Sequence, residues 1–295
     1  MKLVRAAAGP LVTLLAGGLL TVWLVRVAPG YDTDASELDG RRSANSVAAL
    51  RSRNQDTLPV WQAYAHYLVR LGRGDLGTSR AWGLPVGELL RKRGAVTLRA
   101  AGSGLLLGWV VAVGLALAGS CRSLSLVAGV SRSAAASLLC LPSPAIALLL
   151  CLWLRRTGPE WRVAAVVGLA VFARVLLASA AVVAAASREP HVLQARARGL
   201  SSLRLLLSHV LRRSTPALAA LLVAALPLAF SVSVPVETVC NLPGAGQLAW
   251  LAAQKRDLPV LTGLTMALLA ITLLSGSVAR AASRAGAGMA ERSAL

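Results

Sequence analysis

The chain of 295 residues is 56% hydrophobic and carries a formal net charge of +19. Its mean hydropathy of +0.65 is too high for an ordinary soluble domain and is typical of a polytopic membrane protein. The basic residues lie mainly in loops between apolar runs, where membrane orientation and anionic lipid explain them. Aromatic residues make up only 4% of the chain, so we expect no nucleic-acid partner.

Six segments are apolar enough to cross a lipid bilayer as helices, which takes about 20 residues each. They are Ala6–Ala28, Val96–Ala118, Ala134–Leu154, Val163–Ala186, Pro216–Val236 and Pro259–Ala279. The first is too long for the apolar core of a signal peptide, so we interpret it as a retained membrane helix. The predicted fold class is therefore all-α, with six transmembrane helices.

Basic residues predict the orientation of these helices, because Lys and Arg near helix ends resist translocation. Lys2 and Arg5 precede the first apolar segment, and Arg280, Arg284 and Arg292 follow the last one. The loop at 187–215 holds six arginines, at positions 188, 196, 198, 204, 212 and 213. These should outweigh the three arginines at 155, 156 and 162, which would lie in a short outer loop. Both termini and the central loop are therefore expected in the cytoplasm.

The predicted organisation has four parts. Residues 1–28 hold the N-terminus and first helix, and 29–95 form an extracytoplasmic segment. Residues 96–285 form a transmembrane core, and 286–295 are a cytoplasmic tail; the stretch 237–258 is also expected outside. Within the first outer segment, Trp61, Tyr64, Tyr67 and Leu68 fall on one face of a predicted helix at the membrane surface.

The central loop, EPHVLQARARGLSSLRLLLSHVLRRSTP, has a helix–break–helix pattern. A helix is predicted over His191–Arg198, because Pro190 suits a first helical turn. Gly199 ends it, and Ser201 or Ser202 can cap the next helix. In that second helix four apolar residues fall at helical spacing on one face, namely Leu203, Leu206, Leu207 and Val210.

The segment QARARGL…LLLSHVLRRSTP resembles the cytoplasmic coupling loop of ABC importer permeases, especially those of the peptide/nickel type. The family's small residue and glycine match Ala195 and Gly199, and its later leucine and histidine match Leu200 and His209. In that family the short helix of the loop sits in a groove on the ATPase subunit. The resemblance thus implies a set of ATPase-coupling residues: Gln194, Ala195, Arg196, Ala197, Arg198, Gly199, Leu200 and His209.

Three further segments resemble the same family, in family order. The run GDLGTS at 74–79 matches a signature after the first helix, and LPVGELLRKRGAVTLRAAG at 84–102 leads into the second helix. The segment 234–263 follows; it contains Glu237, Thr238, Pro243, Gly244 and Gly246, and then the run DLPV at 257–260. Together with the loop these segments span most of the chain. The acidic-to-basic stretch at 31–55 does not match the family.

The resemblance implies a permease subunit that forms a translocation path for peptides or similar small solutes in a bacterial cell membrane. Its expected partners are a second homologous permease, two ATP-binding subunits, an extracytoplasmic solute-binding protein and the bilayer. No GxxxxGK[ST] motif occurs, so another subunit must use the ATP. We expect no catalytic residue, metal or cofactor, because the three histidines and four cysteines have no ligand spacing.

Three features have two interpretations each from sequence alone. Gly104 and Gly108 let helices approach closely, either within this subunit or on a partner permease. Pro144 and Pro227 break backbone hydrogen bonding, either at the translocation path or as ordinary kinks. Arg174 lies near the centre of an apolar segment, where it either faces a cavity or partner or extends toward the cytoplasm.

Two other classes of function remain open at this point. An ion-coupled secondary transporter would usually show internal repeats, which the sequence lacks, and acidic residues are nearly absent from its apolar segments. A non-transporting membrane scaffold or receptor subunit is the other alternative. Co-purification with ATPase subunits separates both from the permease.

Overall fold

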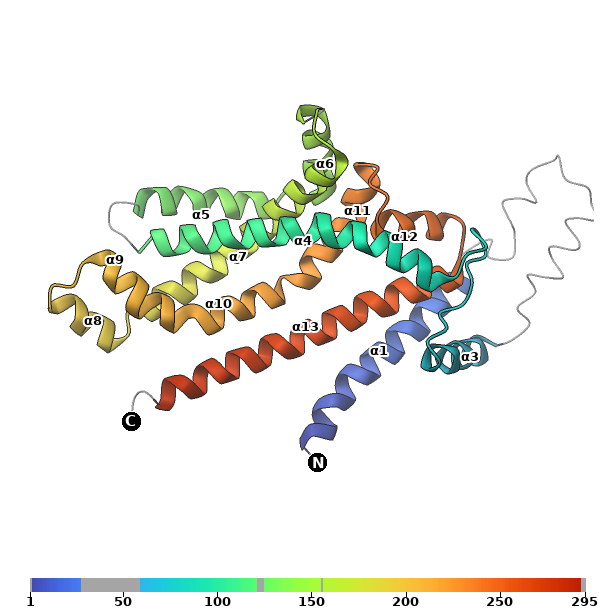
Figure 1. Ribbon diagram of the computed structural model, residues 1–295, viewed down its shortest axis with the longest axis horizontal. Coiled ribbons are helices and arrows are strands. Elements are labelled where there is room, and N and C mark those ends of the chain that lie inside the picture. Colours follow the sequence, from blue (N-terminus) through green and yellow to red (C-terminus); the bar gives the residue numbers. More distant parts are fainter. Residues whose placement is uncertain (1, 28–58, 121–124, 155, 293–295) are drawn as a thin grey trace, which may run out of the picture. The chain divides into compact units, whose positions relative to one another are not determined.

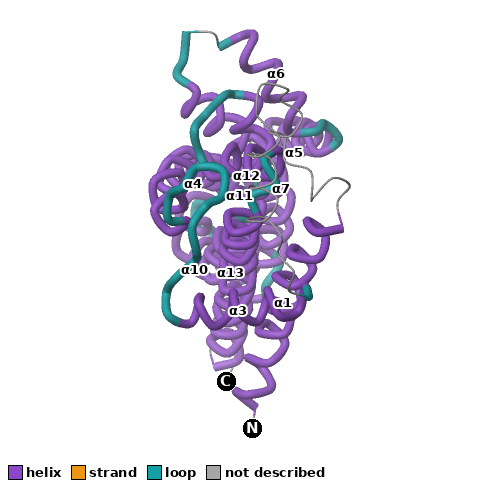
Figure 2. Tube along the Cα trace, turned by 90° about the vertical axis from the view of Figure 1, so that its right-hand side faces the viewer, coloured by secondary structure: helices purple, strands orange, loops and turns teal. Residues whose placement is uncertain are grey.

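The computed structural model describes residues 2–27, 59–120, 125–154 and 156–292. The whole of the unmatched stretch at 31–55, and Arg155, therefore lie outside the described residues. The described parts form helices joined by loops (Figure 2). Their only strand-like feature is a bridge between Thr78 and Pro85. The helices are α1 (Lys2–Val27), α3 (Val60–Gly72), α4 (Val86–Ala118), α5 (Ser125–Leu139), α6 (Ser143–Trp153), α7 (Pro159–Ser187), α8 (Pro190–Ala197), α9 (Ser202–Leu205), α10 (Arg212–Ala224), α11 (Leu226–Val239), α12 (Ala245–Gln254) and α13 (Leu258–Arg292), with a π-helical stretch at Leu206–Leu211.

Five of the described spans are long and apolar enough to cross a membrane. They are Gly9–Val27, Val86–Ala118, Pro159–Ser187, Leu206–Val239 and Leu258–Ala282. A sixth exists if α5 and α6 count as one broken span. This confirms the predicted all-α membrane fold. Several helices extend beyond their predicted limits. For example, α4 begins ten residues before Val96, where Lys92 pairs with Glu88 at 2.7 Å, and α13 continues well beyond Ala279.

The predicted third membrane helix, Ala134–Leu154, is broken into two helices. α5 ends at Leu139 and α6 begins at Ser143, and the two are bent by 107°. Proline explains the break: Pro142 precedes α6 in an extended conformation and Pro144 occupies its first turn. Neither proline can donate the backbone hydrogen bond that a continuous helix needs, whereas both suit a helix start.

The chain divides into two compact units, and each is built around its own apolar side chains. Unit 1 comprises Met1–Gly94 and Leu248–Ala270. In it Val22, Tyr64 and Leu258 form one buried cluster, and a second cluster contains Val86, Leu89, Leu248, Ala252 and Val260. The predicted helix at 61–68 is confirmed as α3, with Tyr64 buried and its hydroxyl donating to the Leu15 carbonyl at 2.9 Å. Trp61 does not share that contact, since it is 65% exposed.

Unit 2 comprises Ala95–Gln247 and Ile271–Leu295, and α7 is its central helix. α7 contacts α5, α6, α10 and α11, and Figure 1 shows α5 and α10 running beside it. Valines on several sides of α7 are fully buried, at positions 163, 166, 167 and 171. α7 begins with Pro159 in its first turn and ends at Ser187, where the chain enters the loop that the sequence marks as functional.

Gly104 and Gly108 of α4 lie against α7. A β-carbon added at Gly104 would overlap the carbonyl oxygen of Ala164, and one added at Gly108 would overlap that of Gly168. These neighbours are backbone atoms of a packed helix and cannot move aside as a flexible side chain would. The close approach that small residues permit is therefore made within this chain.

Candidate functional site

The loop between α7 and α10 begins with a short helix whose start is set by a proline. α8 starts with Pro190 in its first turn, preceded by Glu189 in an extended conformation, and it ends at Ala197. The helix predicted over His191–Arg198 is thereby confirmed to within a residue at each end. α8 and α9 lie together beyond the end of α7 (Figure 1).

α8 has an inner and an outer face. Val192 and Ala195 are buried at 0% and 7% exposure and belong to the core cluster of unit 2. The small side chain of Ala195 lets α8 lie close to that core. The remaining α8 side chains that we expected to couple to the ATPase are exposed, as is Arg198 just after the helix: Gln194, Arg196, Ala197 and Arg198. The loop is thus anchored by one face and open on the other.

Gly199 ends α8 with a backbone φ of +80°. L side chains rarely adopt this left-handed conformation, whereas glycine does so at little cost. A β-carbon added at Gly199 would meet nothing within 4 Å, so the constraint at this position is conformational and not steric. Leu200 follows and packs against the core cluster, which returns the chain to the body of unit 2.

In the second helical part of the loop, residues 202–211, the buried face differs from the predicted one. Leu205 and Val210 are buried at 5% and 1%, whereas Leu207 is 56% exposed. The predicted face that included Leu207 is therefore wrong. The π-helical stretch Leu206–Leu211 is the reason, because its wider turn shifts the buried face away from the 3.6-residue spacing. Residues 202 and 203 have no described side chains; His209 is half-buried.

An ion pair closes the base of the loop. The Nε of Arg213 donates to Glu189 Oε1 at 2.9 Å, and both side chains are about one-third exposed, at 32% and 31%. Glu189 precedes α8 and Arg213 lies in the first turn of α10, so the pair joins the two ends of the loop. The loop is consequently a supported protrusion of unit 2.

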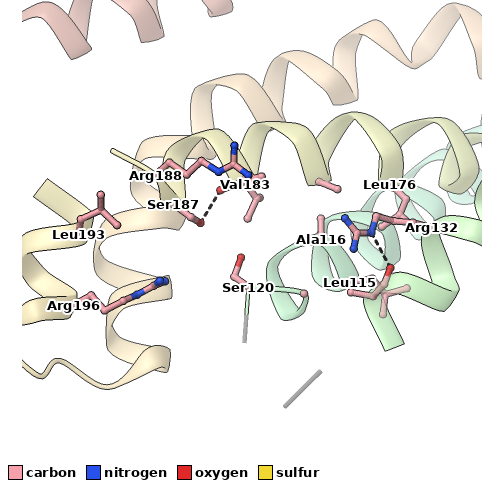
Figure 3. Close-up of a pocket in the computed structure, with 14 residues that line it drawn as sticks. Leu115, Ala116, Ser120, Arg132, Leu176, Val183, Ser187, Arg188, Leu193 and Arg196 are labelled. Carbon is pink, nitrogen blue, oxygen red and sulfur yellow. Dashed lines mark hydrogen bonds between the residues drawn. The ribbon is translucent and has the colours of Figure 1, made fainter. Parts of the chain in front are cut away.

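A cavity of about 310 Å³ lies beside α8, between the ends of α4 and α7 and the first half of α5. Figure 3 shows Arg132 and Arg196 extending toward it from opposite sides, with Ser120 between them. Arg188, which follows α7, also lines it. The last turns of α4 and α7 therefore lie at the same end of unit 2, together with α8.

Arg174 is exposed near the middle of α7, although its neighbours Ala173 and Val175 are 0% and 3% exposed. Residues 181 and 185, both alanine, are also exposed and continue the same face of α7. This chain therefore leaves one narrow face of its central helix uncovered, with a single cation on it.

The two prolines that we associated with the translocation path both begin helices. Pro144 lies in the first turn of α6 and Pro227 in the first turn of α11, directly after the break at Ala225. Both helices pack against α7, and α6 packs against α11. The two helices that begin at these prolines therefore share a common neighbour, α7. Arg174 lies on the exposed face of α7.

Two buried carboxylates, Asp257 and Glu237, accept hydrogen bonds from backbone groups elsewhere in the chain. In unit 1, Asp257 is 0% exposed and accepts hydrogen bonds from the Ser79 hydroxyl and from the Ala81 N–H at 3.0 Å. The run GDLGTS is thereby joined to the start of α13. Within that run Asp75 accepts from the Gly77 N–H at 2.8 Å and pairs with Arg70 at 2.8 Å. These two contacts hold the pKa of Asp75 below its usual value.

In unit 2, Glu237 is 0% exposed and accepts from the Gly246 N–H at 2.7 Å, at the start of α12. The Thr97 hydroxyl accepts from the Ala245 N–H at 2.7 Å. A β-carbon at Gly244 would overlap the Glu237 carboxylate, which explains glycine at this position. Sequence reasoning missed Thr97 because it lies 148 residues from its partner.

The comparisons with known proteins agree with this geometry. The family model of the binding-protein-dependent transport system inner membrane component matches residues 104–285, which is more than half of the chain. The protein therefore belongs to this family of ABC importer permeases, and it is a multi-pass, non-catalytic membrane component.

A particular relative matches over most of the chain. The dipeptide transport system permease protein DppB of Lactococcus lactis subsp. cremoris (strain MG1363) is 24% identical over 272 residues, covering 87% of this chain and 88% of the relative. The predicted resemblance of the chain to importer permeases is thereby confirmed. Family membership also favours ATP-driven transport over the secondary transporter and the scaffold. Permeases of this family work with ATPase and binding-protein partners.

Proposed function

We propose that this chain pairs with a second, homologous permease to form a translocation path for peptides or similar small solutes. Two ATP-binding subunits, or a fused pair, drive it, and an extracytoplasmic solute-binding protein delivers the solute. The observation that carries the proposal is the supported loop with exposed residues on α8, because a protruding anchored helix can transmit movement between subunits.

The proposed coupling site is the outer face of the loop, and its physical basis is the contrast between the two faces of α8. Val192 and Ala195 tie the helix to the core of unit 2. A movement imposed on Gln194 or Ala197 would therefore be passed to α7 and its neighbours instead of being absorbed by a loose loop. Coupling of this kind requires different contacts in two states, which a helix in a moving groove supplies.

The proposed orientation puts both termini, the loop 187–215 and the tail 286–295 in the cytoplasm of a bacterial cell, and 29–95 outside. The shared cavity supports it, because the last turns of α4 and α7 lie at one end of unit 2. The chain must then leave that end and return between these helices, so α5 and α6 together act as one broken crossing. Six arginines in the loop favour the cytoplasm for that end.

The proposed translocation path uses the open face of α7. Arg174 is exposed there, and insertion scales give a cost of about 2.5–3.5 kcal/mol for a central arginine. An aqueous path or the second permease would relieve that cost. The helix breaks at Pro144 and Pro227 leave backbone carbonyls available near such a path.

The solute class rests on the relative that transports dipeptides, at 24% identity. Uptake of a radiolabelled dipeptide by cells that express the complete importer tests it. Arg174→Leu is the variant, and Arg280→Leu, at an exposed arginine of α13 outside the loop, is the matched control. We expect ATP-dependent uptake that falls in Arg174→Leu while membrane insertion is kept. Uptake that is unchanged in Arg174→Leu would exclude that residue from the path, and absence of dipeptide uptake would exclude this solute.

A further inference from the structure

Two cysteines from distant parts of the chain meet in unit 2. Cys151 lies in the last turn of α6, and Cys240 directly follows α11. Their Sγ atoms are 3.5 Å apart across 89 residues of sequence. The two sulfur atoms are thus in contact, and a movement of the side chains would bring them to the ~2.05 Å of a disulfide bond.

This cysteine pair lies at the opposite end of α7 from the six-arginine loop. The positive charge of Arg162, in the first turn of α7, acts on the Cys240 thiol. From Arg162 to Ser187, where α7 ends, the helix is about 38 Å long. That length exceeds the roughly 30 Å of a hydrocarbon layer, so the cysteine pair and the loop belong to opposite sides of the membrane. Figure 1 likewise shows α6 away from α8 and α9.

α6 is packed more tightly at its start than at its end. Ile146 and Ala147 are its buried residues, whereas Trp153 at its end is 86% exposed. In the last turn Cys151 packs against the core cluster that contains Cys240. A covalent bond between these two residues would therefore fasten the more exposed end of α6 to α11.

The Cys240 side of the contact is fixed by the turn that follows α11. The Cys240 N–H donates to the Val236 carbonyl at 2.9 Å, and the Leu242 N–H donates to the Glu237 carbonyl at 2.9 Å. The Glu237 carboxylate also accepts from the Gly246 N–H at the start of α12. A bond to Cys240 would thus attach α6 to a part of the backbone that is itself well held.

We propose that Cys151 and Cys240 form a disulfide bond on the outer side of the membrane, and that this bond holds α6 on α11. Disulfides form and persist outside the cytoplasm, whereas cytoplasmic thiols are kept reduced. The outer location rests on the proposed orientation, but the contact between the two cysteines does not. The sequence alone does not predict this pair, because its members have no characteristic spacing.

Thiol–disulfide exchange with an extracytoplasmic disulfide-bearing protein would make the bond. Burial, and then the adjacent Cys151, raise the pKa of the Cys240 thiol, so the more exposed Cys151 reacts first. Cys151 loses its proton, attacks one sulfur of the oxidant and forms a mixed disulfide. Cys240 then loses its proton and attacks Cys151 Sγ, which displaces the second sulfur of the oxidant. The two protein thiols give up two electrons and two protons, and the oxidant becomes a dithiol.

The test isolates the full-length chain from cells harvested in an alkylating agent, with no oxidant added. Mass spectrometry identifies linked peptide pairs, and thermal unfolding in detergent is measured with and without a dithiol reductant. The variant is Cys151→Ala. The matched control is Cys140→Ala, at an exposed cysteine outside the pair.

We expect a link between positions 151 and 240 in most molecules. Reduction should lower the unfolding midpoint by about 5–10 °C, because a bond across 89 residues restricts the unfolded chain. Cys151→Ala should have the lower midpoint and no response to the reductant, whereas Cys140→Ala should behave like the unmodified chain. Free thiols at both positions, or a link whose reduction leaves the midpoint unchanged, would overturn the proposal.

Labelling of intact cells separates failure of the disulfide from failure of the orientation. Chains whose native cysteines are replaced by serine carry either Glu160→Cys, at the start of α7, or Ser201→Cys, in the loop; both positions are exposed. An impermeant maleimide should label position 160 and not position 201. That pattern together with free thiols at 151 and 240 would overturn the disulfide alone. Label at 201 and none at 160 would overturn the orientation and the disulfide proposal with it.

Discussion

Single residues of the loop and of its supporting contacts are constrained by different physical requirements. Ala195 is small because it is buried against the core, whereas Gly199 is constrained by its φ of +80° and has open space around it. Asp257 and Glu237 are buried carboxylates that accept backbone hydrogen bonds, Asp257 from the Ala81 N–H and Glu237 from the Gly246 N–H at the start of α12. A substitution should therefore be judged by the requirement at its position and not by size alone.

At Gly199 the structure predicts that backbone conformation decides function. Gly199→Val should reduce ATP-driven uptake and ATPase association, because a β-branched residue at positive φ is strained by about 1–2 kcal/mol or more. Gly199→Asn is the matched variant, since asparagine tolerates this conformation. Uptake and pull-down of the ATPase from detergent are the measurements. Equal loss in both variants would show that side-chain bulk, and not φ, matters there.

At Asp257 we predict a loss of stability. Asp257→Ala leaves the Ser79 hydroxyl and the Ala81 N–H without their buried acceptor, which should cost about 3 kcal/mol. The thermal unfolding midpoint in detergent should fall by several degrees. Asp75→Ala, which removes an exposed ion pair, should change the midpoint little. A similar midpoint for the two variants would contradict the role of Asp257.

At the scale of helices, the interruptions between neighbouring helices bear on movement as much as the long membrane-spanning helices do. Pro142 and Pro144 separate α5 from α6, and Ala225 and Pro227 separate α10 from α11. α7 lies between these broken elements and is itself continuous over 29 residues. A continuous central helix with an attached loop can transmit displacement, while broken neighbours can adjust their packing.

The contact between α4 and α7 should not tolerate a single added methyl group. In Gly108→Ala the new β-carbon meets the carbonyl of Gly168, so unit 2 should be destabilised by about 1–3 kcal/mol. Gly114→Ala, on the same helix with open space around it, is the control and should be neutral or slightly stabilising. Thermal unfolding of both variants tests this prediction. If Gly108→Ala were as stable as the unmodified chain, α4 and α7 would not pack so closely.

The packing of α6 on α11 can be tested with native cysteines. The Sγ atoms of Cys151 and Cys240 are 3.5 Å apart, at the ends of these helices. In a chain with serine at 121 and 140, a mild oxidant should form an intramolecular disulfide, seen as a linked peptide pair by mass spectrometry. Failure to form this link under conditions that oxidise exposed thiols would contradict the position of α6.

At the scale of the whole molecule, the sequence predicted the class of protein well and its internal contacts poorly. Apolar segments, Pro190 and Gly199 were sufficient to predict the membrane fold and the short helix of the loop 187–215, because hydrophobicity and backbone chemistry act locally. The bend between α5 and α6 could have been inferred from Pro142 and Pro144. The pairing of Ser79 with Asp257 could not, because a contact across 178 residues leaves no local pattern.

The most direct test of the account places a photo-crosslinking amino acid at Ala197, on the exposed face of α8, in cells that express the complete importer. A second chain carries it at Trp153, which is 86% exposed at the end of α6. We predict an adduct between position 197 and an ATP-binding subunit, and no such adduct from position 153. An ATPase adduct from position 153 with none from position 197 would contradict both the coupling loop and the proposed orientation.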